Sequence, residues 1–553
     1  MQQAEYRQHN EPFLTQNGAL SMPPLPFRLM IALPCLAGIA PLSPAVAGGA
    51  LAASPAQLIV RFAASDCSPA RIERLARNSG IALTLVRPLS SGTCVLRPRR
   101  AMSASDFANL PKRLQDSDVD VRYVEPDVRG SAKANPVSSS GYPPLSGSAH
   151  QWYLDDAQIG LDVARAWRVT EGSANMTVAI IDSGILYDHP ALRGRLRFGY
   201  DMIGEDDNYD FSAPGGKGDK CDRLPVKLGC PFIIAADGDG RDANASDPGD
   251  WIPDELFALA GVAPPPGGDS SSWHGLSIAG VIAGNGRGLS GIDRHARILP
   301  VRVSGRSYRL SDLIDSIRWS AGLPVPGIPA NDTPAQIINM SLGLPREHAE
   351  SCPLILQETI DAAIAHGKTR AIVVSAGNDG ETDWMSAPAS CNGVISVGSV
   401  ERSGQPASYS NRGKRITLFA PVSNQMNRQD DFPVLSHCAR TRPVTDASAC
   451  PDPTAYGAPY GYRAGHGTSI SAPMVSATVA LMLAANPTLT PGGIDYVLRR
   501  SARRFPHGST CNAVGAKCGA GIVNTGAAVE LAARIPGGLR ADLDWKPDPL
   551  PQR

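Results

Sequence analysis

The 553-residue sequence has no excess of either charge, since 52 lysines and arginines balance 52 aspartates and glutamates. Proteins that bind nucleic acid usually carry a basic surface that neutralises phosphates, so the balance argues against a nucleic-acid partner. Internal repeats are also lacking, which argues against a solenoid or a repetitive adhesin. The hydrophobic share of 42% excludes a wholly disordered chain, because such chains bury too little apolar surface to fold.

Beyond the N-terminal region, the chain lacks an uninterrupted apolar run of about 18 residues, so we expect no membrane span. The apolar run at 29–41, followed by Ala45-Val46-Ala47, is typical of a secretory signal peptide and its cleavage site. We expect residues 1–47 to be this signal, with a long polar leading region and a true start at either Met1 or Met22. The mature protein is therefore expected to be secreted, with passage through the periplasm in transit.

Cysteine is scarce, at 11 residues, and no pair has the CxxC spacing of a zinc or redox site. Removal of Cys35 with the signal leaves an even number, as expected for disulfides in an oxidising compartment. The spacing leaves the connectivity open. Because short loops close readily, we expect pairing in sequence order: Cys67/Cys94, Cys221/Cys230, Cys352/Cys391, Cys438/Cys450 and Cys511/Cys518.

Residues 55–131 predict a small α+β domain. Four strand-like segments alternate with two helical segments, one at 68–80 with Ser68 as N-cap and Gly80 as its end, the other at 103–117. The order βαββαβ is that of a ferredoxin-like domain. A polar linker of small residues follows at 132–147, and exposed linkers of this kind are where proteases cut.

Residues 148–535 predict an α/β domain. Short runs rich in Val and Ile alternate with helical segments, which favours a doubly wound, mainly parallel sheet flanked by helices. Residues 204–272 are polar and rich in Gly and Asp, so we expect an inserted loop region there. The Pro-rich residues 536–553 are expected to form a disordered tail.

Two motifs supply candidate acid–base residues. In VAIIDSGI, Asp182 ends a predicted buried strand, which is where active sites of α/β proteins form. In WHGLSIAG, His274 begins a predicted helix, whose dipole favours the neutral imidazole that a general base needs. Taken alone, the aspartate is more simply a loop cap and the histidine a structural residue.

Two further motifs supply a candidate nucleophile and an oxyanion donor. In GHGTSISAP, Ser469 lies at the start of a long apolar helix, where backbone N–H groups are available for an anion. In VVSAGNDG, Asn378 follows a buried strand, and its amide can donate to a developing oxyanion. The alternative for Asn378 is an ordinary turn residue before Asp-Gly.

In this order, Asp182, His274, Asn378 and Ser469 resemble the subtilase family of subtilisin-like serine proteases. The resemblance covers residues 150–530 and includes INMSLG and GAGIVNTGAAV. It implies a serine endopeptidase in which Asp182 orients His274 and His274 accepts the proton of Ser469. It further implies that Ser469 forms an acyl-enzyme, whose oxyanion is held by Asn378 and the Ser469 N–H.

The same resemblance implies a substrate cleft. An extended peptide is expected to pair with the edge formed by Ser341, Leu342 and Gly343, with residues 307–309 as the opposing edge. The wall of the pocket for the residue before the scissile bond is implied to contain Ala376, Gly377 and Ser386. No acidic residue is expected at the base of this pocket, which disfavours a trypsin-like preference.

The sequence departs from the family at several positions. The family's usual HGTHVAG reads HGLSIAG here, and Met474 stands where the Ser motif usually has His. Ala191 replaces the carboxylate that the family's strong calcium site takes from its HPDL motif, so we do not expect that site. The insert offers other oxygen donors for a structural Ca²⁺, namely Asp237, Asp239 and Asp242, followed by Asp247 and Asp250.

No cofactor is expected for the chemistry itself, and the alternative for the acidic insert is a solvated loop.

The N-terminal domain resembles the family's propeptides, which implies an intramolecular chaperone and inhibitor removed by cleavage within residues 129–140. The expected partners are protein or peptide substrates and this propeptide, and we expect a monomer. The alternatives are an exopeptidase or processing protease, and a catalytically inactive subtilase-like binding protein.

Overall fold

The computed structural model describes residues 57–64, 66–131, 151–204, 240–250, 271–286, 289–305, 307–346, 351–422, 433–437 and 460–536. The predicted signal peptide, the linker at 132–147 and most of the insert lie outside these ranges. The same holds for the tail beyond residue 536 and for Asp237 and Asp239.

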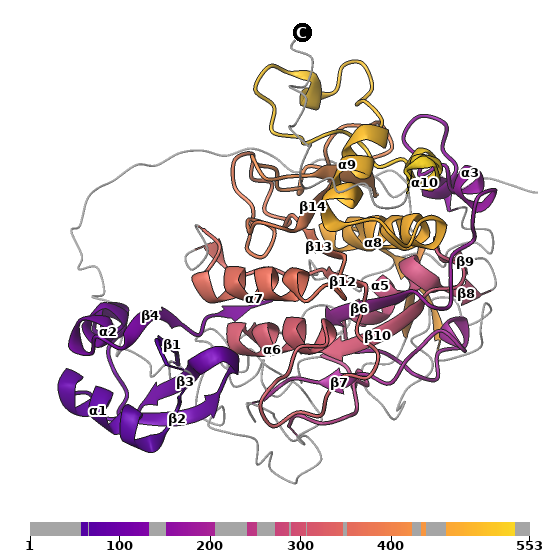
Figure 1. Ribbon diagram of the computed structural model, residues 1–553. Helices are drawn as coiled ribbons and strands as arrows, with labels where there is room; N and C mark the ends of the chain where they lie inside the picture. Colours follow the sequence, from indigo (N-terminus) through magenta and orange to yellow (C-terminus); the bar gives the residue numbers. More distant parts are fainter. Residues whose placement is uncertain are drawn as a thin grey trace, which may run out of the picture. The chain divides into compact units, whose positions relative to one another are not determined.

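The N-terminal domain has the predicted βαββαβ order (Figure 1). Its four antiparallel strands are arranged β2-β3-β1-β4 and share a separate apolar core with the two helices. Ser68 Oγ accepts from Arg71 N at 3.4 Å, and Gly80 ends the first helix with φ +69°, as predicted. The elements are β1 (Leu58–Phe62), α1 (Pro69–Ser79), β2 (Leu83–Pro88), β3 (Thr93–Pro98), α2 (Ala104–Ser117), β4 (Val121–Pro126) and β5 (Arg129–Gly130).

The larger domain is built on a seven-stranded sheet in the order β15-β14-β13-β12-β6-β10-β7, and every neighbouring pair is parallel. The chain enters at β6, continues to β7 and β10 on one side and then to β12 on the other. The carboxyl end of β6 is therefore a topological switch point, where ligands bind in such sheets. The strands are β6 (Thr177–Asp182), β7 (Tyr200–Asp201), β10 (Arg297–Arg302), β12 (Ile337–Met340), β13 (Ala371–Ser375), β14 (Ile395–Val400) and β15 (Leu418–Pro421).

Helices cover both faces of this sheet, as predicted (Figure 1). Helix α5 packs against α8 on one face, and α6 packs against α7 on the other. The helices are α3 (Val163–Trp167), α5 (His274–Ala283), α6 (Leu310–Ser320), α7 (Leu354–Ala365), α8 (Thr468–Ala485), α9 (Pro491–Ser501) and α10 (Thr525–Arg534). The short strands are β8 (Asn285–Gly286), β9 (Leu289–Ser290), β11 (Tyr308–Arg309), β16 (Pro433–His437) and β17 (Tyr460–Ala464).

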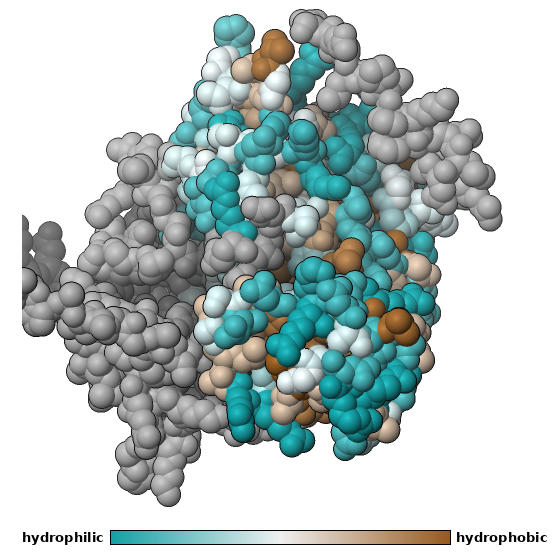
Figure 2. Space-filling view, turned by 90° about the vertical axis from the view of Figure 1, so that its left-hand side faces the viewer, coloured by the Kyte–Doolittle hydropathy of each residue, from teal (hydrophilic) through white to brown (hydrophobic). Residues whose placement is uncertain are grey.

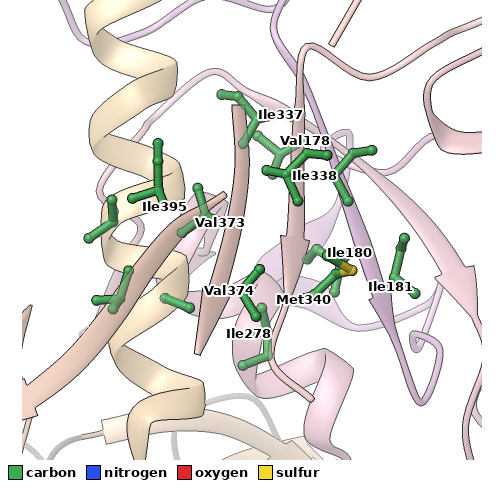
Figure 3. Close-up of a cluster of buried hydrophobic side chains, with 14 of the residues drawn as sticks. Val178, Ile180, Ile181, Ile278, Ile337, Ile338, Met340, Val373, Val374 and Ile395 are labelled. Carbon is green, nitrogen blue, oxygen red and sulfur yellow. The ribbon is translucent and has the colours of Figure 1, made fainter. Parts of the chain in front are cut away.

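The core lies between the sheet and these helices. Figure 3 shows side chains of four neighbouring strands and Ile278 of α5 meeting in one cluster. All the strand residues labelled there are Val, Ile or Met, the residues expected in strands buried on both faces. They are Val178, Ile180, Ile181, Ile337, Ile338, Met340, Val373, Val374 and Ile395.

Among the described helices, α8 alone is long and apolar enough to cross a membrane, but 89% of that stretch is buried inside the protein. It is therefore the central helix of the fold. On the face shown in Figure 2, the described surface is mainly hydrophilic, and hydrophobic side chains are scattered over it.

Three of the predicted disulfides are present: Cys67–Cys94, Cys352–Cys391 and Cys511–Cys518. Each joins cysteines that are neighbours in sequence order, so the expected pairing is confirmed for these six residues. The other two predicted pairs, Cys221/Cys230 and Cys438/Cys450, lie outside the described residues.

The N-terminal domain contacts α6 and α7 through charged groups. Glu125 accepts from the backbone N of Leu354 and Ile355, at 2.8 and 3.1 Å, at the start of α7. Asp127 accepts from Ser311 N and Oγ, at 2.9 and 2.8 Å, at the start of α6. Because helix N-termini favour negative charge, both carboxylates suit these positions, even though burial raises the pKa of each.

A four-charge cluster adds to this contact. Arg87 of the N-terminal domain forms ion pairs with Asp312 and Asp315 on α6. Arg241, from the described end of the insert, forms ion pairs with the same two carboxylates. Both aspartates are nearly inaccessible to solvent, so each depends on these guanidinium groups for compensation of its charge.

Candidate active site

Asp182 is the last residue of β6, at the switch point of the sheet, and is fully buried. Its backbone O accepts from Val303 N at 2.9 Å, which fixes the end of the strand next to β10. Its Oδ1 accepts from Ser183 N at 2.8 Å, so the carboxylate is oriented by the chain that follows it.

His274 begins α5, as predicted, and is 3% exposed. Its Nδ1 lies 2.8 Å from Asp182 Oδ1 and 3.0 Å from Oδ2. A ring nitrogen that faces a carboxylate at this distance carries the proton, which leaves Nε2 as the acceptor. Nε2 is buried and has no hydrogen-bond partner among the described residues. The pair is therefore arranged as a base whose acceptor atom is available.

Ser469 is the second residue of α8 and is also 3% exposed. Gly467 precedes the helix with φ +96°, a backbone conformation that side chains other than glycine rarely adopt. Ser469 Oγ donates to Ser341 O at 3.4 Å, and Ser341 Oγ donates to Ser469 O at 2.8 Å. In the described part of the chain, no hydrogen bond joins Ser469 to His274, although α5 and α8 pack together.

Asn378 follows β13 and contacts the residue before Ser469. Its Oδ1 accepts from Thr468 N and from Thr468 Oγ1, both at 2.8 Å. Thr468 Oγ1 also accepts from Gly377 N at 3.2 Å. These contacts fix the orientation of the Asn378 amide at the start of α8. The sequence motif GTS contained Thr468, but nothing in the pattern indicated this role.

The predicted substrate edges lie against the end of the N-terminal domain. Tyr308 and Arg309 of β11 pair antiparallel with Gly130 and Arg129 of β5. Gly343 exchanges two backbone hydrogen bonds with Ser131, both at 3.1 Å. Residues 129–131 thus lie between the two edges.

The remaining predicted cleft residues are buried. Leu342 is 2% exposed, and Ala376 and Gly377 are buried at the end of β13. Ser386 Oγ donates to Leu344 O at 2.5 Å, so its hydroxyl holds the backbone beside Gly343. A Cβ on Gly343 would lie 2.5 Å from this hydroxyl oxygen, which accounts for glycine at that position.

Of the three expected calcium ligands, Asp242 lies among the described residues, whereas Asp237 and Asp239 lie outside them. Asp242 Oδ1 accepts from Asn244 N at 2.8 Å within a local turn. Asp247 and Asp250 instead bind Ser183 and Ser272. Burial, with the nearby charge of Asp250, raises the pKa of Asp247 to about 7. Among the described residues, no group of three or more His, Cys, Asp or Glu side chains is arranged to hold a metal.

Comparisons with known proteins agree with the geometry. The model of the Subtilase family matches residues 173–521. An extracellular protease of Xanthomonas campestris is 33% identical over 88% of this chain and 71% of its own length. An extracellular basic protease of Dichelobacter nodosus is 33% identical over 75% of this chain and 58% of its own length. The solved structure of a Pseudoalteromonas arctica protease is 32% identical, with a TM-score of 0.55, over 71% of this chain and all of that chain.

Proposed function

Because this chain belongs to the subtilase family of serine proteases, we propose that it is a secreted endopeptidase made as a zymogen. Secretion agrees with relatives that are named extracellular proteases. The observation that carries the proposed chemistry is the pair formed by His274 Nδ1 and Asp182, with a buried, unpartnered Nε2 on the other side of the ring among the described residues.

In the proposed mechanism, His274 Nε2 takes the proton of Ser469 Oγ as this oxygen attacks the peptide carbonyl. Asp182 stabilises the imidazolium that forms. His274 then gives the proton to the leaving amine, which leaves an acyl-enzyme on Ser469. A water molecule, deprotonated by the same nitrogen, hydrolyses this ester and restores the serine.

Substrate pairing explains how Ser469 becomes available to His274. Gly343 already pairs with an extended segment, and Ser341 lies two residues earlier on the same edge. A peptide residue opposite Ser341 would donate its N–H to the carbonyl that now accepts from Ser469. The substrate N–H would thus displace the Ser469 hydroxyl from the Ser341 carbonyl, and the hydroxyl could then donate to His274 Nε2.

The oxyanion of the tetrahedral intermediate is proposed to accept from Asn378 Nδ2 and from Ser469 N. The support is the fixed amide of Asn378, whose Oδ1 is held by two hydrogen bonds from Thr468. An amide oriented before the reaction needs no reorganisation when charge develops, which is the main advantage of such a site.

The N-terminal domain, residues 55–131, is proposed to be the propeptide, with activation in the linker at 132–147. The support is that its last residues pair with Tyr308, Arg309 and Gly343, on the two proposed substrate edges, where they would exclude a substrate chain. We propose that Ser469 itself cuts the linker. A structural Ca²⁺ bound by Asp237, Asp239 and Asp242 is a separate proposal, which thermal unfolding with and without a chelator would test.

The test compares the exported full chain with Ser469→Ala by intact mass, N-terminal sequence and casein hydrolysis. We expect the variant to lose about 10⁶-fold in turnover, as loss of the serine does in this family. We also expect the variant to retain its N-terminal domain, because it would no longer cut its own linker. Identical processing of both would show that another protease activates the chain. Failure of the wild type to react with a fluorophosphonate would favour the inactive binding protein, and peptide mapping of digests separates endopeptidase from exopeptidase.

A further inference from the structure

A carboxylate from the insert contacts the chain at the end of β6, which carries Asp182, and through it the start of α5, which carries His274. Asp247 is 2% exposed, and its Oδ2 accepts from Ser183 Oγ at 2.8 Å. Ser183 follows Asp182 directly and is also buried. The hydroxyl of Ser183 in turn accepts from the backbone N of Gly275 at 3.1 Å, and Gly275 follows His274. One hydroxyl thus connects the insert with both halves of the acid–base pair.

The backbone of the insert is fixed at the same place. Ile185 N donates to Ala245 O at 3.0 Å, and Asp247 N donates to Ile185 O at 2.8 Å, in a parallel bridge. Asp247 Oδ1 also accepts from Gly249 N at 2.9 Å. The N–H of Gly249 therefore holds one carboxylate oxygen of Asp247, and this fixes the position in which the other oxygen accepts from Ser183.

Glycines allow the segments to approach closely. A Cβ on Gly184 would lie 2.8 Å from Ala245 O, and a Cβ on Gly275 would lie 2.2 Å from Gly184 O. Because backbone meets backbone at these positions, a small displacement of the insert is transmitted to the residues on either side of the acid–base pair. A second contact also joins the insert to this region. Ser272, which lies two residues before His274, donates its N–H and its Oγ to Asp250 at 2.5 and 2.7 Å.

We propose that Asp247 is a positioning residue of the active site, which acts through Ser183 on the backbone of Gly275 and so fixes His274 relative to Asp182. It does not touch the reacting atoms. The inference rests on the proposed protease function and deepens it, because it makes the insert part of the catalytic apparatus. A purely structural Asp247 would anchor the insert and leave the turnover of the folded enzyme unchanged.

The test measures kcat and KM on a peptide substrate for the mature enzymes obtained from full chains that carry Asp247→Ala, Ser183→Ala or both substitutions. Active enzyme is counted by fluorophosphonate titration. A misplacement of about 1 Å in a catalytic group costs about 10²-fold, so we expect kcat to fall about 10–100-fold with KM within about twofold. The double variant should lose no more than the stronger single variant, because both substitutions break one connection.

The matched control is Asp293→Asn, which alters a second buried aspartate that also holds neighbouring chain, since it accepts from the backbone N–H groups of His295 and Ala296. It should retain wild-type kcat. If Asp247→Ala does not fold, Ser183→Ala still tests the connection, since it leaves Asp247 bound to Gly249. An unchanged kcat in folded Ser183→Ala, a change in KM alone, or additive losses would overturn the inference. A wild type that neither reacts with the fluorophosphonate nor cleaves substrate would instead overturn the proposed function.

Discussion

Ser131 and Gly343 exchange both backbone hydrogen bonds, each at 3.1 Å between N and O. This pair continues the direction of β5, whose Arg129 and Gly130 pair with β11. The end of the N-terminal domain therefore has a defined register against the edge that leads to Ser341 and, through its carbonyl, to Ser469.

The register predicts the bond that is cut. In an antiparallel pair, residue numbers rise along one strand as they fall along the other. Because Ser131 lies opposite Gly343, continued pairing would place Lys133 opposite Ser341. We expect cleavage of the Lys133–Ala134 bond, selected by this register rather than by a preference of the pocket for a basic side chain. N-terminal sequencing of the first processed product checks this, and a mature N-terminus other than Ala134 would contradict the register.

A side chain at Gly130 should interfere with docking of the N-terminal domain, the proposed propeptide. A Cβ there would lie 2.2 Å from Cζ of the buried Tyr308 ring. Overpacking costs about 1–3 kcal/mol, so Gly130→Val should slow maturation about tenfold or more. Intact mass over time measures the rate. Tyr308→Ala in the same chain should restore it, and equal rates for Gly130→Val and wild type would show that the contact does not matter.

Loss of the Asn378 amide should lower turnover. Asn378→Ala removes the proposed donor to the oxyanion, and we expect kcat to fall about 10²–10³-fold with little change in KM. Steady-state kinetics on a peptide substrate measure both. The control is Asn331→Ala, since the Asn331 Oδ1 accepts from Thr333 N in a loop outside the site. A rise in KM without loss of kcat would exclude the proposed role.

The disulfide Cys352–Cys391 should contribute strongly to stability. It joins Cys352, two residues before the start of α7, to the segment after Ser386 and closes a separation of 39 residues. Chain-entropy arguments give about 4 kcal/mol for a loop of this length. Urea unfolding of the double variant Cys352→Ser, Cys391→Ser in a Ser469→Ala background measures the loss. A free energy of unfolding equal to that of Ser469→Ala alone would contradict this prediction.

Asp293 should make stability depend on pH. Burial raises its pKa from the ordinary 3.8 to about 6, so the folded protein binds this proton more tightly than the unfolded chain does. The stability that the folded protein gains by binding this proton is therefore complete below about pH 4 and is lost as the pH rises through 6. Asp293→Asn should therefore be more stable than wild type at neutral pH, by on the order of 3 kcal/mol, with no gain at pH 4. Unfolding free energies across this range, in a Ser469→Ala background, check the sign; parallel curves would refute it.

The strands, the helices and the main candidate residues could be predicted because their signals are local. VAIIDSGI predicts a buried strand that ends at Asp182, and the helix at 68–80 carries its own N-cap and glycine end. The three described disulfides could be predicted for the same reason, since each joins two cysteines that are consecutive in the sequence.

Contacts between distant segments could not be predicted. Asp247 was one of several aspartates in an acidic insert, and nothing in its spacing indicated Ser183, 64 residues earlier. The ion pairs of Arg87 with Asp312 and Asp315 likewise depend on how two domains meet. Such pairings follow from tertiary packing, which a pattern of residues along the chain does not record.

Helix α8 has no polar face, because it is surrounded by protein on nearly all sides. When the protein unfolds, this segment enters water with the apolarity of a membrane span. Exposed segments of this kind associate with one another faster than they refold. We therefore expect the working lifetime of the secreted protein to be governed by its rate of unfolding, so that substitutions that slow unfolding prolong activity even where the equilibrium free energy of unfolding is unchanged.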